Sequence, residues 1–271
     1  MTLRICVAGA TGWVGRSLVA AIGEANDLQL VGAVARRRAG EDAGIVAGGS
    51  PLGLAIAPSV AAALAVPTDV LIDYTKPDSV KAHALGAIAR RVGVVVGTSG
   101  LTAGDYGEID AAAKAEGVGV IAAGNFSLTA ALLQHFALLA ARHLPQWEII
   151  DYAGAGKIDA PSGTARELAE RMAAIKSPAI GRPLDRIHGA REARGASIDG
   201  VQVHSLRLPG FVLSCEALFG LPDERLTIRH DAGSSAAPYI AGTLIAARRV
   251  GQIKGLVRGL DTLLFGTAAK P

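Results

Sequence analysis

The sequence predicts an α/β protein in which a Rossmann-like, doubly wound parallel sheet is joined to a second α+β domain with a mixed or antiparallel sheet. Three observations support this fold class. Short apolar runs alternate with helix-like segments in the first half of the chain, a glycine-rich turn follows the first run, and three strand-like runs stand together after residue 200. Alternating strands and helices are typical of a parallel sheet, whereas neighbouring strands favour antiparallel pairing.

The first half supplies the elements of the parallel sheet. An apolar strand is expected over residues 3–8, followed by the turn 9–15, a helix to about residue 22 and a second strand over 28–35. Further strands are expected over 70–73, 92–97 and 118–122, and helices over 79–91 and 105–116.

The second half has a different character. A long helix over 128–143 precedes a strand over 148–152, a glycine-containing loop over 153–163 and a helix over 164–174, where Thr164 and Glu167 have capping-box spacing. Residues 177–200 read as a loop. Strands are expected over 202–208, 212–219 and 225–230, and helices over 238–250 and 255–265.

Composition and charge exclude several classes of function. The 27 Lys and Arg residues exceed the 24 Asp and Glu residues by only three and are scattered, so we expect no nucleic-acid partner. No run of about 18 apolar residues is free of charges or breakers, and the first residues lack the apolar core of a signal peptide, so we expect no membrane partner. Cys6 and Cys215 lie far apart, which favours a reducing compartment and a cytoplasmic location.

Three glycines form the first functional motif. Gly9, Gly12 and Gly15 follow a strand and open a helix, in the pattern GxxGxxG. Glycines at such positions permit a tight turn, close approach of phosphate and close helix–strand packing, and the helix start offers free N–H groups to a pyrophosphate. The motif therefore predicts dinucleotide binding; the alternative is a turn with a purely structural role.

The residues after the second strand predict which dinucleotide is bound. An acidic residue at this position typically binds the ribose of NAD, whereas arginine suits the additional phosphate of NADP. Here Arg36, Arg37 and Arg38 occupy it, and the first acid is Glu41. We expect NADPH to be preferred, with NADH possible; the alternative is a solvated basic turn.

A second motif lies in the loop before the helix over 164–174. This stretch, from Lys157 to Ala165, reads KIDAPSGTA. Hydroxyl and N–H groups of Ser162, Gly163 and Thr164 at a helix start, with the positive charge of Lys157 nearby, would bind a small anionic substrate. The alternative is a capped helix after a loop.

The motifs together resemble the dihydrodipicolinate reductase family of lysine biosynthesis. KIDAPSGTA is similar to the family signature KxDAPSGTA, and further matching segments follow in order: VAGATGWVGR, DVLIDYTKPDSV, VVVGTSGL, AAGNFSL, WEIID and GLVRGLDTLL. The resemblance covers essentially the whole chain. It implies NAD(P)H-dependent reduction of a C=N bond in a small anionic imine-type substrate, by an enzyme that is usually a homotetramer built through its second sheet.

The resemblance also assigns domains and site residues. It implies a dinucleotide-binding domain over residues 1–124 and 236–271, completed by the C-terminal helices, and a substrate-binding and oligomerisation domain over 125–235. Lys157, Ser162, Gly163 and Thr164 match substrate-binding positions. The cofactor-binding positions are Gly9, Ala10, Thr11, Gly12, Trp13, Val14, Gly15, Arg36, Arg37, Gly97, Thr98, Ser99, Ala123, Gly124, Asn125 and Phe126.

This chain departs from the family pattern in its substrate half. The family has a histidine pair before the signature lysine, where this chain has Ala153 and Gly154, and Ser235 replaces a basic residue. We therefore expect a divergent member that reduces a different cyclic imine, with Lys157 as the catalytic proton donor or electrostatic anchor. Asp151, Tyr152 and Asp159 are alternative donors that also read as ordinary strand-end and turn residues.

Two other functions stay open at this point. One is the ordinary lysine-pathway reductase working without its histidine pair, and the other is a non-catalytic regulator that binds NADPH. His204 and His230 fall in expected strands, where structural roles are typical, and the histidines have no spacing that indicates a metal site.

Overall fold

The computed structural model describes residues 2–266 of the chain. It divides into two compact units, of which the first comprises Met1–Ser127 and Ala236–Leu263, and the second comprises Leu128–Ser235 and the segment that begins at Leu264. Residues 267–271, which the sequence assigned to the dinucleotide-binding domain, lie outside the described residues, as does Met1.

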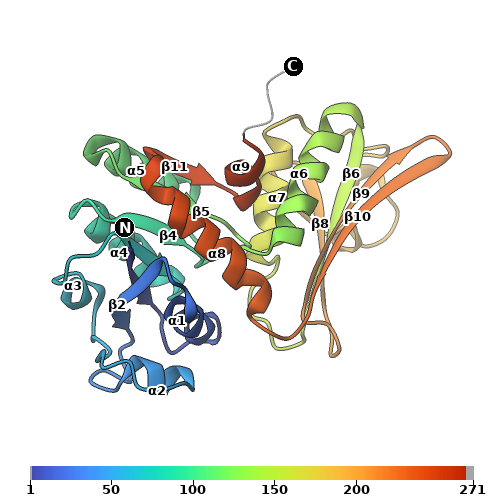
Figure 1. The fold of residues 1–271 in the computed structure, drawn as a ribbon. Coiled ribbons are helices and arrows are strands. Elements are labelled where there is room, and N and C mark those ends of the chain that lie inside the picture. Colours follow the sequence, from blue (N-terminus) through green and yellow to red (C-terminus); the bar gives the residue numbers. More distant parts are fainter. Residues whose placement is uncertain (1, 267–271) are drawn as a thin grey trace. The chain divides into compact units, whose positions relative to one another are not determined.

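The first unit is built on a six-stranded parallel sheet within the described residues (Figure 1). The strand order is β11-β5-β4-β3-β1-β2, so the chain pairs β2 on one side of β1 and β3 on the other. This reversal confirms the doubly wound fold that the sequence predicted. The strands are β1 (Leu3–Ala8), β2 (Leu28–Val34), β3 (Val70–Asp73), β4 (Gly93–Val96), β5 (Gly119–Ala122) and β11 (Gly255–Arg258).

Helices accompany this sheet because apolar strands that are buried on both faces need cover on both faces. Every residue of β3, β4 and β5 is buried, so these three strands lie in the core of the unit. The helices are α1 (Trp13–Glu24), α2 (Ala43–Ala47), α3 (Val60–Ala63), α4 (Pro77–Ile88), α5 (Ala103–Glu116), α8 (Ala237–Arg249) and α9 (Leu260–Phe265), with the 3-10 turn η3 (Val250–Gln252).

The helix expected over 255–265 is wrong in its first half. Gly255–Arg258 is strand β11, which pairs in parallel with β5, and a helix begins only at Leu260. Gly255 has a φ of +86°, a conformation that suits glycine and separates the strand from the residues before it. The Asp110 carboxylate accepts a hydrogen bond of 2.9 Å from the Leu256 N–H, which holds the strand in register.

In the part of the second unit that the structure describes, the strands form a mixed five-stranded sheet of order β10-β9-β6-β8-β7. Strands β6 and β8 are parallel, and the other neighbours are antiparallel. The strands are β6 (Gln146–Ala153), β7 (Ala196–Ile198), β8 (Val201–Arg207), β9 (Leu213–Leu221) and β10 (Glu224–Ala232). The stretch 177–200, expected as a loop, contains β7 and the 3-10 turns η1 (Leu184–Arg186) and η2 (Arg191–Arg194).

Two helices, α6 (Leu128–His143) and α7 (Gly163–Ala173), cover one face of this sheet (Figure 1). Side chains alternate along β6, so that Ile149 and Asp151 are buried while Glu148, Ile150 and Tyr152 are only half-buried. Ile149 belongs to an apolar cluster with residues of both helices, and burying a side chain of this size contributes about 1.5–3 kcal/mol. We call the opposite face, which carries Glu148, Ile150 and Tyr152, the outer face.

No helix among residues 2–266 is both long and apolar enough to cross a membrane.

Candidate active site

The glycine turn after β1 has no room for side chains. Gly9 has a φ of +83°, and a Cβ atom there would lie 2.4 Å from the carbonyl oxygen of Tyr74. A Cβ atom on Gly15 would lie 2.1 Å from the carbonyl oxygen of Gly9. Both positions therefore require glycine, because backbone atoms and not flexible side chains fill the space.

The start of α1 presents unused N–H groups. Gly12 precedes the helix, and no side chain caps it. Among residues 2–266, the N–H groups of Trp13 and Val14 have no hydrogen-bond partner. Ala10 is buried and donates its N–H to Val34, whereas Thr11 and Gly12 are more accessible. A cradle of glycines beside free N–H groups fits the pyrophosphate of a dinucleotide.

Two arginines stand at the end of β2. Arg36 and Arg37 are exposed, and within the described part of the chain neither guanidinium forms a hydrogen bond or ion pair. Arg38 differs, because its guanidinium binds the Glu41 carboxylate at 2.8 Å.

Lys76, which lies in the segment DVLIDYTKPDSV but received no role in the sequence analysis, adds charge to this region. The pKa of the Asp78 carboxyl is lowered, mainly by a hydrogen bond from Ser79 and further by the positive charges of Arg36 and Lys76. Lys76 follows β3, whereas Arg36 follows β2, so cations from the ends of two strands act on one carboxylate. Positive charges from the ends of two strands therefore lie close together here, an arrangement that favours a phosphate.

A buried carboxylate holds the segments that follow β3 and β4. Asp73 is fully buried, and its Oδ1 accepts hydrogen bonds from the Thr75 N–H at 2.8 Å and the Thr98 hydroxyl at 2.9 Å. Its Oδ2 lies 2.8 Å from the His83 Nδ1. Thr98 was predicted to contact the cofactor, but Asp73 and His83 were not, because the fold alone brings them together.

Tyr74 connects three segments of the predicted cofactor site. Its carbonyl oxygen occupies the space beside the Gly9 Cα, and its ring occupies the space beside the Gly97 Cα, where a Cβ atom would lie 2.2 Å from the ring. Its ring centroid lies 6.3 Å from that of Phe126. The Tyr74 hydroxyl lies 2.7 Å from that of Thr243, and burial raises its pKa. Tyr74 lies in the family-like segment DVLIDYTKPDSV, but the sequence assigned it no role, because a single tyrosine after a strand carries no distinct functional signal.

The remaining predicted cofactor residues follow β4 and β5. Ser99 is exposed, Ala123 donates its N–H to Val96 at 3.2 Å, and Asn125 accepts a hydrogen bond from the Ser127 N–H at 2.8 Å. Since β1, β2, β3, β4 and β5 are parallel, the residues that follow them share one edge of the sheet, which is where such folds bind nucleotides.

The second unit carries the predicted substrate residues on one loop. The Lys157 ammonium lies 2.6 Å from the Asp159 carboxylate, and each side chain is 32% exposed. Asp159 thus holds the lysine without burying it, so the charge stays available to an anionic ligand.

Ser162 begins helix α7. Its hydroxyl accepts a hydrogen bond from the Ala165 N–H, which makes Ser162 the N-cap. The capping box expected at Thr164 and Glu167 is therefore wrong: Thr164 lies inside the helix, and the buried Glu167 accepts a hydrogen bond from Gln134. The Gly163 N–H has no partner among the described residues and stands at the first helical position, where an anion is favoured.

The positions of the absent histidine pair offer no side-chain proton. Ala153 is buried and Gly154 follows it at the end of β6. Tyr152 lies on the outer face, where its hydroxyl donates to the Glu216 carboxylate at 3.1 Å. His230 is buried, and its Nδ1 lies 3.0 Å from the Thr129 hydroxyl.

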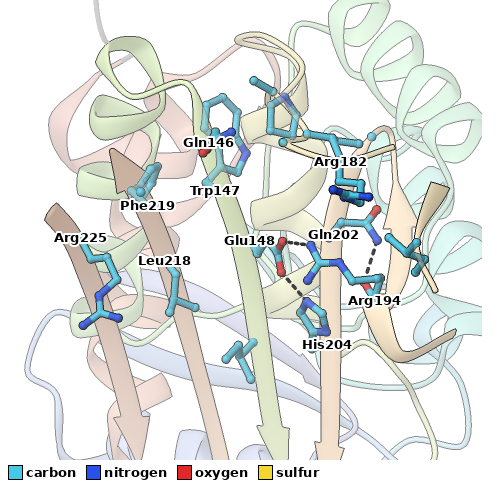
Figure 2. A pocket seen from close by; sticks show the side chains of 18 residues that line it. Gln146, Trp147, Glu148, Arg182, Arg194, Gln202, His204, Leu218, Phe219 and Arg225 are labelled. Carbon is cyan, nitrogen blue, oxygen red and sulfur yellow. Dashed lines mark hydrogen bonds and ion pairs between the residues drawn. The ribbon is translucent and has the colours of Figure 1, made fainter. Parts of the chain in front are cut away.

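The outer face has a hollow of about 590 Å³ (Figure 2). Glu148 stands at its centre, where its carboxylate binds the Arg194 guanidinium and lies 2.7 Å from the His204 Nε2. None of the predicted substrate residues, all of which the structure describes, lines this hollow. It is therefore separate from the Lys157 loop.

The comparisons with known proteins agree on one family. The chain matches the models "Dihydrodipicolinate reductase, N-terminus" over residues 3–126 and "Dihydrodipicolinate reductase, C-terminus" over residues 129–264. A 4-hydroxy-tetrahydrodipicolinate reductase of Moorella thermoacetica is 41% identical, with 97% of this chain and 98% of the relative covered. Another, from Desulfitobacterium hafniense, is 38% identical over the same shares.

Solved structures agree with these relatives. The dipicolinate-bound dihydrodipicolinate reductase of Paenisporosarcina sp. TG-14 has a TM-score of 0.77 and 31% identity, with 97% of this chain and 100% of that chain covered. An amine dehydrogenase of Mycobacterium smegmatis, at 16% identity and a TM-score of 0.66 with 96% of each chain covered, shares the fold alone.

Proposed function

Because the chain belongs to the dihydrodipicolinate reductase family, we propose that it is an ordinary 4-hydroxy-tetrahydrodipicolinate reductase of lysine biosynthesis. It is an NAD(P)H-dependent reductase, as its relatives are. The observation that carries the proposal is the 41% identity over nearly the full length of a relative with that name. The missing histidine pair favoured a divergent imine reductase, but the comparisons favour the ordinary enzyme.

The first unit would hold the cofactor. The bound nicotinamide supplies the hydride. Gly9–Gly15 would bind its pyrophosphate, Arg36 and Arg37 its additional phosphate, and the segments 97–99 and 123–126 its nicotinamide half. Two exposed guanidinium groups that form no ion pair within the described residues support a preference for NADPH, with NADH as the weaker cofactor.

The second unit would bind the substrate, a small anion with carboxylate groups. Lys157 and the start of α7 at Ser162, Gly163 and Thr164 supply the positive charge and N–H groups that such an anion needs. Lys157 also carries a proton that it can donate, whereas Ala153 and Gly154 cannot.

The outer face would mediate assembly into a homotetramer. Its mixture of apolar residues, such as Ile150 and Leu218, with paired charges, such as Glu148 and Arg194, suits an interface between identical copies.

Reduction of freshly generated 4-hydroxy-tetrahydrodipicolinate tests this function, with NADPH oxidation followed by its near-ultraviolet absorbance. We expect kcat in the ordinary range of about 1–1000 s⁻¹ and a higher kcat/KM for NADPH than for NADH. A background rate would exclude the ordinary enzyme. Oxidation of NADPH by another cyclic imine would then favour the divergent enzyme, and NADPH binding without any oxidation would favour the regulator.

A further inference from the structure

A buried ion pair lies beside the Lys157 loop. Asp151 of β6 is fully buried, and the Arg207 side chain at the end of β8 is 16% exposed. The Arg207 Nη2 donates to the Asp151 Oδ2 at 2.8 Å. The parallel register of β6 and β8 places these two residues on the helix-covered face of the sheet.

This ion pair forms hydrogen bonds with two residues of the Lys157 loop, Asp159 and Ser162. The Ser162 N–H donates to the Asp151 Oδ2 at 2.9 Å, so the start of α7 is fixed to the carboxylate. The Arg207 Nη2 also donates to the Asp159 carbonyl at 2.6 Å. Because the Asp159 side chain binds the Lys157 ammonium, the lysine is held through the same guanidinium.

The cost of this pair argues for a role beyond stability. Burying two charges costs hydration free energy, which their mutual attraction often fails to offset. Apolar side chains of similar volume at these two positions would often stabilise the fold equally well or better. The pair is also incompletely satisfied, because the Asp151 Oδ1 and the Arg207 Nε are buried without partners among the described residues. A planar guanidinium with several donors can, however, fix two acceptors in a defined geometry, which an apolar pair cannot.

We propose that Arg207 is a positioning residue of the substrate site, which holds Lys157 and the Ser162 helix start at the spacing that a dicarboxylate requires. It acts through Asp159 and Asp151 and does not touch the substrate. This proposal rests on the proposed function, because it assigns Lys157 and Ser162 to the substrate.

Arg207→Lys tests the proposal, because the lysine side chain keeps the charge but is one bond shorter, so its ammonium cannot occupy the Nη2 position from which Arg207 reaches both Asp151 and Asp159. The probe is dipicolinate, titrated calorimetrically in the presence of NADPH. We expect the dipicolinate Kd to rise at least about tenfold and kcat/KM for the substrate to fall at least as much, while the Kd of NADPH stays within about twofold. An unchanged dipicolinate Kd and kcat/KM would overturn the proposal.

Two matched variants separate positioning from general stability. Ser205→Ala removes another hydrogen bond to the Asp151 Oδ2, 3.1 Å long, without touching the loop. Arg171→Lys changes a partly buried arginine near the other end of α7, where it donates to Gln134. Both should keep the wild-type dipicolinate Kd. If either weakens dipicolinate as much as Arg207→Lys at an equal loss of Tm, the role of Arg207 is only structural and the proposal fails.

A second variant covers the case in which Arg207→Lys does not fold. Asp159→Ala removes the partly exposed carboxylate through which Lys157 is held, and it should leave Tm unchanged. We expect kcat/KM to fall at least about tenfold. A wild-type value would refute the proposal that Arg207 positions Lys157 through Asp159. If the wild-type protein neither binds dipicolinate nor turns over, the proposed function fails instead.

Discussion

At the scale of single residues, Lys157 is the side chain on which the proposed chemistry depends most. Its ion pair with Asp159 is accessible, so the ammonium can contact an incoming anion. We expect Lys157→Ala to lower kcat/KM by about 100-fold or more, as loss of a charged transition-state contact does. Steady-state kinetics check this result. Lys254→Ala, which removes an exposed lysine of the first unit, should behave as wild type.

Arg36 and Arg37 decide the proposed preference between cofactors. Replacing both by alanine should weaken NADPH binding about 10- to 100-fold, since hydrogen bonds to charged groups contribute about 1.5–3 kcal/mol. The affinity for NADH should change little, and fluorescence titration of each cofactor measures both effects. Arg38→Ala is the control, because Glu41 already engages that guanidinium. Equal losses for NADPH and NADH would argue against recognition of the additional phosphate.

His230 gives the second unit a dependence on pH. Burial lowers the pKa of its imidazole, so the folded unit keeps this group neutral at a pH where the unfolded chain, with a pKa of about 6.5, binds a proton. Stability should therefore fall as pH drops below about 6.5. Urea denaturation above and below this pH measures the free energy of unfolding, and its decrease at the lower pH should be smaller for His230→Asn than for wild type. His188→Asn, at an exposed position, should retain the wild-type slope.

At the scale of elements, helix α1 contains two glycines with opposite roles. Gly15 faces the Gly9 carbonyl, and Gly23 has no atom within 4 Å of the space where its Cβ would lie. Gly15→Ala should lower the free energy of unfolding by about 1–3 kcal/mol and weaken NADPH binding, because the backbone must move. Gly23→Ala should raise the free energy of unfolding by about 0.5–1 kcal/mol. Urea denaturation and NADPH titration compare the two. Equal effects would show that the turn does not require a bare Cα at position 15.

Most strands of the parallel sheet could be predicted because each is a predominantly apolar run between turn signals. Strand β11 could not, since its four residues carry no period of their own and only pairing with β5 makes them a strand. The same limit applies to the second unit, where β7 is defined by its pairing with β8. Local sequence indicates what a segment can form, whereas the partner decides between the possibilities.

The candidate site divides in the same way. The glycine turn and the Lys157 loop are contiguous motifs, so their residues could be singled out from the sequence. The contacts of Asp73 with His83 and of Asp151 with Arg207 could not, because strand register and helix packing create them between residues that no local pattern connects.

At the scale of the whole molecule, the proposed homotetramer would have a mass of about 110 kDa, four times that of the 27.5 kDa chain. Ile150→Asp should dissociate it, because a carboxylate would replace an apolar side chain of the outer face and would be buried without a partner in the proposed interface. Sedimentation velocity measures the change. The control Val66→Asp, at an exposed position of the first unit, should leave the assembly intact. A wild-type chain that sediments as a monomer would contradict the assembly itself.

Strand β11 also determines when the first unit can be completed during synthesis. A ribosome that has made the chain as far as Val250 has already released β5, whose outer edge has no neighbour until Gly255–Arg258 emerge. During that interval the free edge of β5 exposes unpaired N–H and C=O groups, which can form hydrogen bonds with strands of other chains. Translation that stops just short of this strand should therefore yield aggregation-prone protein, even though every residue of the glycine turn and the lysine loop is present.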